Sequence, residues 1–269
     1  MNFHSDKWIM DCVQEHYNEA LEHFPENRIV GIFYQGSGNY GLDYEGSDVD
    51  TKLIVTPTFE DIAMNRKAIS TTHIRENDEH IDFKDIRLML QTFRKQNLNF
   101  LEILFTDYKI LNPIYAEQWN RLIEHNEKIA SYAPVQMAKS MQGIAKEKYF
   151  AMEHHYPSRM AWINKFGYDP KQVHHLFRVE EYMQRRFAGE KYARCLKSNK
   201  ADWLQNVKLG CLSLEEARVQ AKRSIDNIDE MCKSFLATCL KEPNNEVDIL
   251  LDDVQYNIMK IAIKKEIGD

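Results

Sequence analysis

The order of the hydrophobic patterns along the chain constrains the fold more than any other feature of the sequence. Short apolar runs rich in β-branched and aromatic residues, typical of strands, occur at residues 28–34, 51–55 and 79–83. From Pro134 onward the apolar residues recur only at the three- and four-residue spacing of helices. This order predicts an α+β fold: a mixed β-sheet flanked by helices, followed by an all-helical region.

Helices are predicted both in the strand-containing region and in the helical region after Pro134. The predicted helices cover residues 6–24, 85–93, 135–155, 170–188, 213–240 and 247–266, and Pro113 is placed to begin another. A chain of 269 residues suits one large domain or two small ones. We therefore expect an α/β domain at residues 1–127 and a helical domain at residues 128–269.

Charge is distributed unevenly between these regions. The chain carries 35 basic and 41 acidic residues, a net charge of −6. Residues 1–130 hold 13 basic and 22 acidic residues, whereas residues 131–200 hold 13 basic and 6 acidic ones. A basic region favours a phosphate-bearing ligand, although two differently solvated surfaces explain the same numbers.

Composition excludes several classes of protein. With 43% hydrophobic residues and few glycines and prolines, the chain is neither disordered nor collagen-like. It has no run of roughly 18–20 apolar residues and no basic-then-apolar leader, so we expect a cytoplasmic protein without a membrane partner. Its five cysteines form no Cys-x-x-Cys pair, which favours reduced structural thiols over a disulfide framework or a zinc ribbon.

The most informative motif joins two predicted strands. Gly36 and Ser37 follow the strand at 28–34, and Asp48 and Asp50 open the strand at 51–55. Side chains two apart in a strand share a face, so the two carboxylates converge and need a cation between them. Mg²⁺ held by a few carboxylates and by substrate phosphates meets that need. Glycine lets backbone N–H groups approach a phosphate, and the serine hydroxyl adds a donor.

A third carboxylate would make a two-metal site possible. Asp82 alternates with apolar Ile81 and Phe83 on the strand at 79–83, so it faces away from the core. Asp78 and Asp85 are nearby alternatives.

A second cluster of polar residues opens the helix predicted at 170–188. Asp169 and Pro170 suit an N-cap and a first helical position. Lys171, His174 and Arg178 then lie at i, i+3 and i+7 on one face. Such a stripe would meet a triphosphate, and a solvated basic stripe is the alternative.

Taken together, these motifs resemble a known family. The run from Gly36-Ser37 to Asp48-Val49-Asp50, with Asp82 on a later strand, resembles the signature of nucleotidyltransferases of the DNA polymerase β superfamily over roughly residues 28–110. The second half looks like the predicted nucleotidyltransferases called RlaP-like, whose Gly-Tyr-x-x-Lys-x-x-His-x-x-x-Arg pattern is matched from Gly167 to Arg178.

The resemblance implies a role for each of these residues. Gly36 and Ser37 would contact the nucleoside triphosphate, and Asp48 and Asp50 would bind metal ions. Asp82 would join the ion that activates the attacking hydroxyl. The nucleotide would also be bound by Lys171, His174 and Arg178. Glu102, on the apolar segment 100–105, is a further acidic residue that would line the site.

The expected function is Mg²⁺-dependent nucleotidyl transfer, with two ions and with Mn²⁺ as a possible substitute. The enzyme would move a nucleoside monophosphate from an NTP to an acceptor hydroxyl and release pyrophosphate. An RNA end is the favoured acceptor, and a protein side chain, a small molecule or a second nucleotide remain open. The alternative is a nucleotide-binding regulatory or antitoxin-like interaction protein with little turnover. The preferred NTP and the oligomeric state also remain open.

Other polar and aromatic clusters are interpreted as structural. The pairs His154-His155 and His174-His175 lack the spacing of zinc ligands. A solvated helical face accounts for Lys139, Lys146 and Lys148, with a phosphate channel as the alternative. Packing between helices accounts for the aromatic residues, with stacking on a nucleic-acid base as the alternative; these are Tyr149, Phe150, Tyr156, Trp162 and Phe166.

Overall fold

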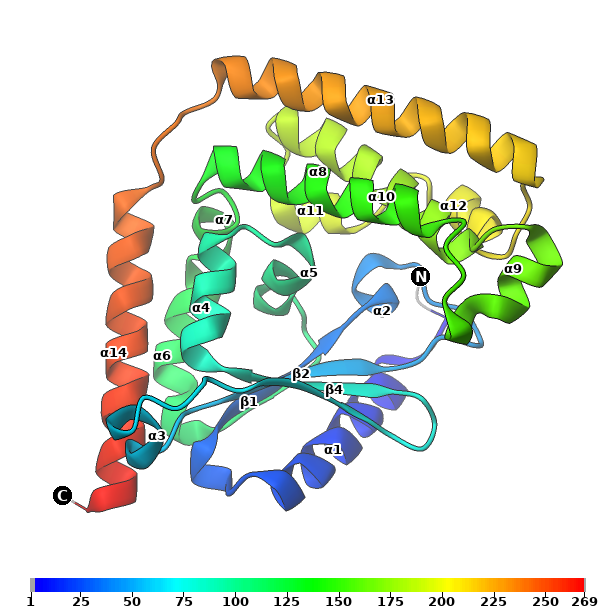
Figure 1. The fold of residues 1–269 in the computed structure, drawn as a ribbon. Coiled ribbons are helices and arrows are strands. Elements are labelled where there is room, and N and C mark those ends of the chain that lie inside the picture. The colour runs from blue at the N-terminus through cyan, green and yellow to red at the C-terminus, as the bar shows by residue number, and fades with distance from the viewer. Residues whose placement is uncertain (1–2, 269) are drawn as a thin grey trace. The chain divides into compact units, whose positions relative to one another are not determined.

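The computed structural model describes residues 3–268, and residues 1–2 and 269 lie outside the described part. The fold is α+β, with a mixed sheet early in the chain and mostly helices after it (Figure 1). Contacts divide the chain into two compact units, Met1–Tyr132 with Glu242–Asp269, and Ala133–Lys241. No helix among residues 3–268 combines the length and the apolar character needed to cross a membrane.

The sheet confirms the expected mixed architecture. In residues 3–268 it has five strands in the order β3-β4-β2-β1-β5, with β2 and β4 parallel and the other neighbours antiparallel. The strands are β1 Ile29–Gln35, β2 Asp50–Val55, β3 Ser70–Ile74, β4 His80–Asp85 and β5 Lys109–Leu111. The expected strands correspond to β1, β2 and β4. The polar edge strand β3 and the three-residue β5 were missed because neither carries an apolar run.

Helices of the first unit surround this sheet. They are α1 Asp6–His23, α2 Ser37–Tyr40, α3 Phe59–Ala63, α4 Ile86–Arg94, α5 Leu98–Leu101, α6 Pro113–Glu124, α7 Asn126–Ile129 and α14 Asn245–Ile267, with 3₁₀ turns η1 Glu26–Arg28 and η2 Glu102–Leu104. Figure 1 shows α1 on one face of the sheet and α4 on the other.

The second unit is all-helical in its described residues, as the sequence predicts. Its elements are α8 Pro134–Ala151, η3 Pro157–Arg159, α9 Met160–Phe166, α10 Pro170–Phe187, α11 Tyr192–Leu196, α12 Ala201–Lys208 and α13 Leu214–Thr238. Helix α10 packs against α8, α12 and α13. The short helices α9, α11 and α12 were not expected, since each is too short to show a clear period.

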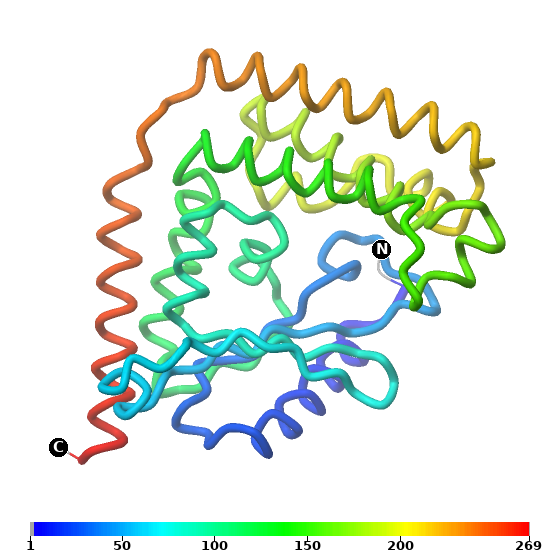
Figure 2. Tube along the Cα trace, viewed as in Figure 1, coloured from blue at the N-terminus to red at the C-terminus, as the bar shows by residue number. Residues whose placement is uncertain are grey.

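The last helix, α14, belongs to the first unit, whereas the sequence assigned it to a helical domain at 128–269. It packs on α4 and α6, and the end of the chain runs beside them in Figures 1 and 2. Arg94 of α4 donates to Asp248 at 2.8 Å and to Asp252 at 2.6 Å, and the Tyr132 hydroxyl donates to Asp248 at 2.6 Å. Helical periodicity alone does not reveal which neighbour a helix packs against.

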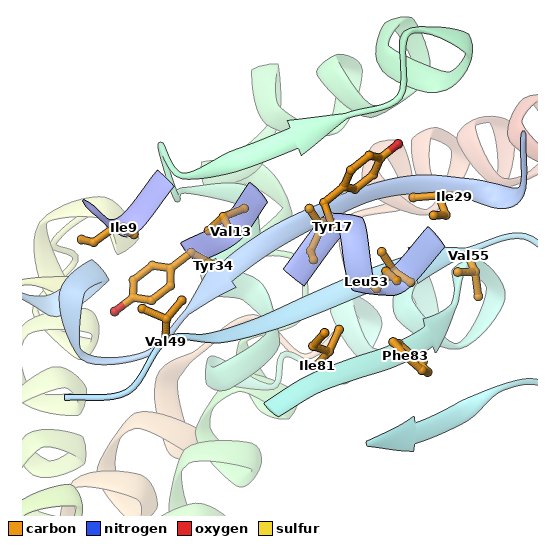
Figure 3. Packing of buried hydrophobic residues seen from close by; sticks show 12 residues of the cluster. Ile9, Val13, Tyr17, Ile29, Tyr34, Val49, Leu53, Val55, Ile81 and Phe83 are labelled. Atoms are coloured by element: carbon orange, nitrogen blue, oxygen red, sulfur yellow. The ribbon is translucent and has the colours of Figure 1, made fainter. Parts of the chain in front are cut away.

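One hydrophobic cluster of the first unit lies between α1 and the sheet (Figure 3). Buried Ile9, Val13 and Tyr17 of α1 pack on alternate residues of the strands, among them Leu53 and Ile81. Because strand side chains alternate between faces, the residues between these point to the opposite face. That second face carries the polar residues of the candidate site.

Candidate active site

The register of the sheet places a row of polar side chains on the face opposite α1. Asp50 pairs with Gln35 of β1, and Lys52 pairs with Asp82 of β4. Asp82 in turn pairs with Thr72 of β3. Residues two apart on one strand, or paired across neighbouring strands, share a face. The face therefore presents carboxylate, ammonium, amide and hydroxyl groups close together.

The Gly36–Ser37 turn joins this row directly. Gly36 follows Gln35, the residue that pairs with Asp50, and it has φ 114° and ψ −154°, a conformation that glycine alone adopts readily. A Cβ added to Gly36 would meet nothing within 4 Å, so open space lies in front of this backbone. The Ser37 hydroxyl lies 3.4 Å from that of Ser47, which precedes Asp48. The turn and the aspartate pair are thus brought together.

Asp48 and Asp50 differ in their surroundings. Asp48 is exposed, and no hydrogen bond or ion pair ties it to another described residue. Asp50 is half-buried, and its Oδ1 accepts from the His80 amide at 2.9 Å and faces His80 Nδ1 at 3.0 Å. Burial and then the charge of Asp48 raise the pKa of Asp50, although the hydrogen bonds from His80 oppose the rise. A divalent cation would relieve this repulsion.

Asp82 already has a cationic partner. Its Oδ2 accepts from Lys52 Nζ and from Gln35 Nε2, each at 3.2 Å, and its Oδ1 accepts from the Thr72 hydroxyl at 2.6 Å. Burial alone would raise the pKa of Asp82, but the charge of Lys52 and these hydrogen bonds outweigh it, so the pKa is lowered.

Lys52 itself is only 3% exposed. Its ammonium donates to Gln35 and lies 4.1 Å from the centre of the Phe100 ring. Sequence reasoning missed Lys52, Gln35 and His80. Spacing was the available signal, since Lys52 lies two residues after Asp50, and His80 lies two residues before Asp82.

A metal site of three carboxylates is therefore not formed by these side chains. Within residues 3–268, no group of three or more His, Cys, Asp or Glu side chains is placed to hold one ion. Asp48 and Asp50 fit a divalent cation that takes its other ligands from water and phosphate. Asp82 does not fit as a third ligand, because it would first have to leave Lys52.

Of the other carboxylates, Asp85 and Glu102 are buried and have partners, whereas Asp78 is exposed. Asp85 is 1% exposed, caps α4 and pairs with Arg87 at 2.6 Å. Asp78 lies in the exposed turn between β3 and β4, with a φ of 65°. Glu102 is 2% exposed and accepts a hydrogen bond from the Tyr40 hydroxyl of α2. Its carboxylate supports the element that follows the Gly36–Ser37 turn.

In the second unit, α10 begins as the sequence predicts. Asp169 accepts from the Lys171 amide at 3.0 Å, and Pro170 is the first helical residue. Lys171 is half-buried, and Arg178 is 7% exposed.

His174, on the same helix, does not fit the phosphate-binding role. It is 3% exposed, and its Nδ1 donates to the Leu204 carbonyl at 2.8 Å. Burial, with the nearby Arg178, Lys208 and Lys171 charges, lowers the pKa of His174 to about 3. The ring is therefore neutral near pH 7 and adds no positive charge to the stripe.

No protein-family model matches the chain, and no curated protein matches it significantly.

Proposed function

We propose that the first unit binds a nucleoside triphosphate together with Mg²⁺ and transfers its nucleoside monophosphate to an acceptor hydroxyl. The observation that carries the proposal is the register Gln35–Asp50, which brings the Gly36–Ser37 turn beside the Asp48–Asp50 pair. Hydrogen-bond donors for phosphate oxygens and a site for a cation then lie next to each other on one face of the sheet. This is the arrangement that a metal-bound triphosphate needs.

Each group of this site has a role in the proposal. Asp48 and Asp50 bind the cation, and the Gly36–Ser37 backbone and the Ser37 hydroxyl donate to phosphate oxygens. A bound Mg²⁺ supplies charge neutralisation at the phosphates. The acceptor oxygen forms a bond to the α-phosphorus as the bond to the bridging oxygen breaks; pyrophosphate leaves, and the acceptor proton passes to solvent.

Asp82 takes a different part from the one that the family resemblance implies. With its pKa lowered by Lys52, Asp82 is a weak base, and we assign it to holding the Lys52 ammonium on the face of the sheet that also carries Asp50. The proposal thus needs one ion, either Mg²⁺ or Mn²⁺. A second ion at Asp82 would have to displace Lys52.

The basic residues of α10 form a separate part of the proposal. Lys171 is half-buried and keeps its proposed role in phosphate binding, whereas the buried Arg178 and the buried, neutral His174 do not.

Pyrophosphate release tests the reaction. The protein would be given each of the four NTPs with Mg²⁺, with and without a pool of small RNAs. We expect Asp48→Ala/Asp50→Ala to lower release by at least about a hundredfold, since the cation is lost. Asp107→Ala is the control, because Asp107 is an exposed aspartate of the same unit. Equal release by wild type and the double variant would contradict the proposal.

One observation favours the second candidate, a nucleotide-binding regulatory protein with little turnover. The Lys52–Asp82 pair leaves Asp48 and Asp50 without a third carboxylate ligand. That protein would bind NTP in an Mg²⁺-dependent way without releasing pyrophosphate. Equilibrium binding of each NTP, measured beside the release assay, separates the two candidates. RNA-dependent release would in addition identify the acceptor class.

A further inference from the structure

Glu79 lies immediately before β4 and is only 7% exposed. Its two carboxylate oxygens have different tasks. Oε1 accepts from the backbone amide of Val49 at 3.1 Å. Oε2 accepts from Arg75 at 2.7 Å, from Asn77 at 2.8 Å and from His16 Nε2 at 3.0 Å. The carboxylate therefore ties Val49, the residue between the two candidate aspartates, to Arg75, Asn77 and the buried His16.

The Val49 amide needs this partner because it precedes the strand ladder. Pairing between β2 and β4 begins at Thr51 and Ile81, and Val49 is only 1% exposed. A buried amide without an acceptor costs about 1–3 kcal/mol, so the native structure must supply one. The Glu79 side chain does so where the backbone of β4 no longer can.

His80, the residue after Glu79, holds Asp50, the last residue of the Asp48-Val49-Asp50 motif. Its backbone amide donates to Asp50 Oδ1 at 2.9 Å. Two consecutive residues thus hold Asp48-Val49-Asp50, one through a side chain and one through the backbone.

A buried histidine fixes Glu79 in turn. His16 of α1 is fully buried; its Nε2 donates to Glu79, and its Nδ1 lies 2.9 Å from the Thr51 hydroxyl. A hydroxyl, an imidazole and a carboxylate in sequence are the components of a nucleophilic triad. Here Thr51 and His16 are both 0% exposed, so no substrate reaches them. This row of three hydrogen-bonded side chains therefore has a structural role.

We infer that Glu79 is a positioning residue: its carboxylate fixes the Val49 peptide and thereby the separation and direction of the Asp48 and Asp50 carboxylates. The inference rests on the proposed function in one respect, that these two aspartates bind a divalent cation. It adds that their geometry is set by a residue that does not touch the cation. Replacing residues that orient metal ligands typically weakens metal affinity by about 10–100-fold.

Mn²⁺ binding to the full chain, measured by titration calorimetry without nucleotide, tests the inference separately from catalysis. We expect Glu79→Ala to weaken Mn²⁺ affinity by about tenfold or more. Glu79→Gln is expected to lose less, because its amide oxygen still accepts from Val49. Arg75→Gln is the matched control: it removes a partner at 2.7 Å from Glu79 but leaves the Val49 contact, so its affinity stays near the wild-type value.

Several outcomes would overturn the inference. Wild-type affinity in a cooperatively folded Glu79→Ala protein would do so, and so would an equal loss in Arg75→Gln, which would indicate general destabilisation. If Glu79→Ala does not fold, Glu79→Asp decides, because its shorter side chain withdraws the acceptor from the Val49 amide: weaker binding with cooperative unfolding supports the inference, and unchanged binding overturns it. Failure of the proposed function looks different, because wild type would then bind Mn²⁺ no better than Asp48→Ala/Asp50→Ala, and both ideas would fall.

Discussion

At the scale of single residues, the expected position of a cation depends on which carboxylates already have hydrogen-bond donors or cationic partners. Asp82 and Glu79 are both supplied with donors, and the pKa of each is lowered although burial opposes it. Asp50 has a raised pKa, because burial and the neighbouring Asp48 outweigh the hydrogen bonds from His80. The unbalanced negative charge therefore lies at Asp48 and Asp50, where a cation is expected.

Acid titration should reveal the strength of the Glu79 network. Burial raises the pKa of Glu79, but hydrogen bonds from His16, Asn77 and Val49 lower it from 4.5 to about 2. The stabilisation is therefore complete above pH 4.5 and is lost as the pH falls toward about 2. We expect urea unfolding of wild type and Glu79→Gln to differ by about 3 kcal/mol at pH 6, and the difference to shrink in this acid range. A difference that does not change with pH would contradict the assignment.

Backbone conformation, rather than crowding, should explain the requirement for glycine at position 36. Gly36→Ala is expected to cost about 1–3 kcal/mol in the free energy of unfolding, because φ is 114°. It should also raise the KM for the NTP.

Gly143 of α8 is the matched control for this substitution. An added Cβ meets nothing within 4 Å there either, but the backbone is helical. Gly143→Ala should therefore stabilise the protein by about 1 kcal/mol. A neutral Gly36→Ala protein with unchanged KM would show that the turn can rearrange without loss.

At the scale of elements, α10 shows that local sequence determines where a helix begins, whereas packing determines which of its residues are buried. Asp169 and Pro170 determine where the helix starts, as expected from the sequence. Packing then buries most of its length, including His174 and Arg178, which the sequence had assigned to a phosphate-facing stripe. Helical spacing places residues on a common face, but neighbouring helices decide whether that face is solvated.

The Asp169 cap should be among the more sensitive points of the second unit. Its carboxylate is 1% exposed and accepts two hydrogen bonds from Arg159, at 2.7 Å each, besides the one from the Lys171 amide. Asp169→Ala should lower the free energy of unfolding by about 2–4 kcal/mol. Asp169→Asn keeps a capping oxygen and should lose roughly half as much. Chemical denaturation compares them; an Asp169→Ala protein as stable as wild type would contradict this account.

At the scale of the whole molecule, the first unit combines two separate stretches of the sequence, because α14 packs with residues 1–132. Helix α14 buries Val247, Leu251 and Val254 in that unit, while Ile249 of the same helix is 62% exposed. Fully burying an aliphatic side chain stabilises by about 1.5–3 kcal/mol. Burial of these three side chains of α14 therefore stabilises the first unit.

Two alanine substitutions on α14 test this packing. Leu251→Ala should lower the free energy of unfolding by about 2–5 kcal/mol, because Leu251 is 0% exposed. Ile249→Ala should change it by no more than about 0.5 kcal/mol, since its side chain is largely in water. Urea unfolding of both variants measures the contrast. Equal effects would mean that α14 is not docked as described.

The sequence by itself determined the fold class, three of the strands, the long helices and the cap of α10, because each depends on local periodicity or on a short-range hydrogen bond. It also placed Gly36, Ser37, Asp48 and Asp50 at the junction of two strands. Only the tertiary structure decided that Asp82 pairs with Lys52, that Glu79 holds Val49, and that α14 packs with the first unit. These contacts join residues 30 or more positions apart, and their partners depend on sheet register and helix docking, which no local pattern encodes.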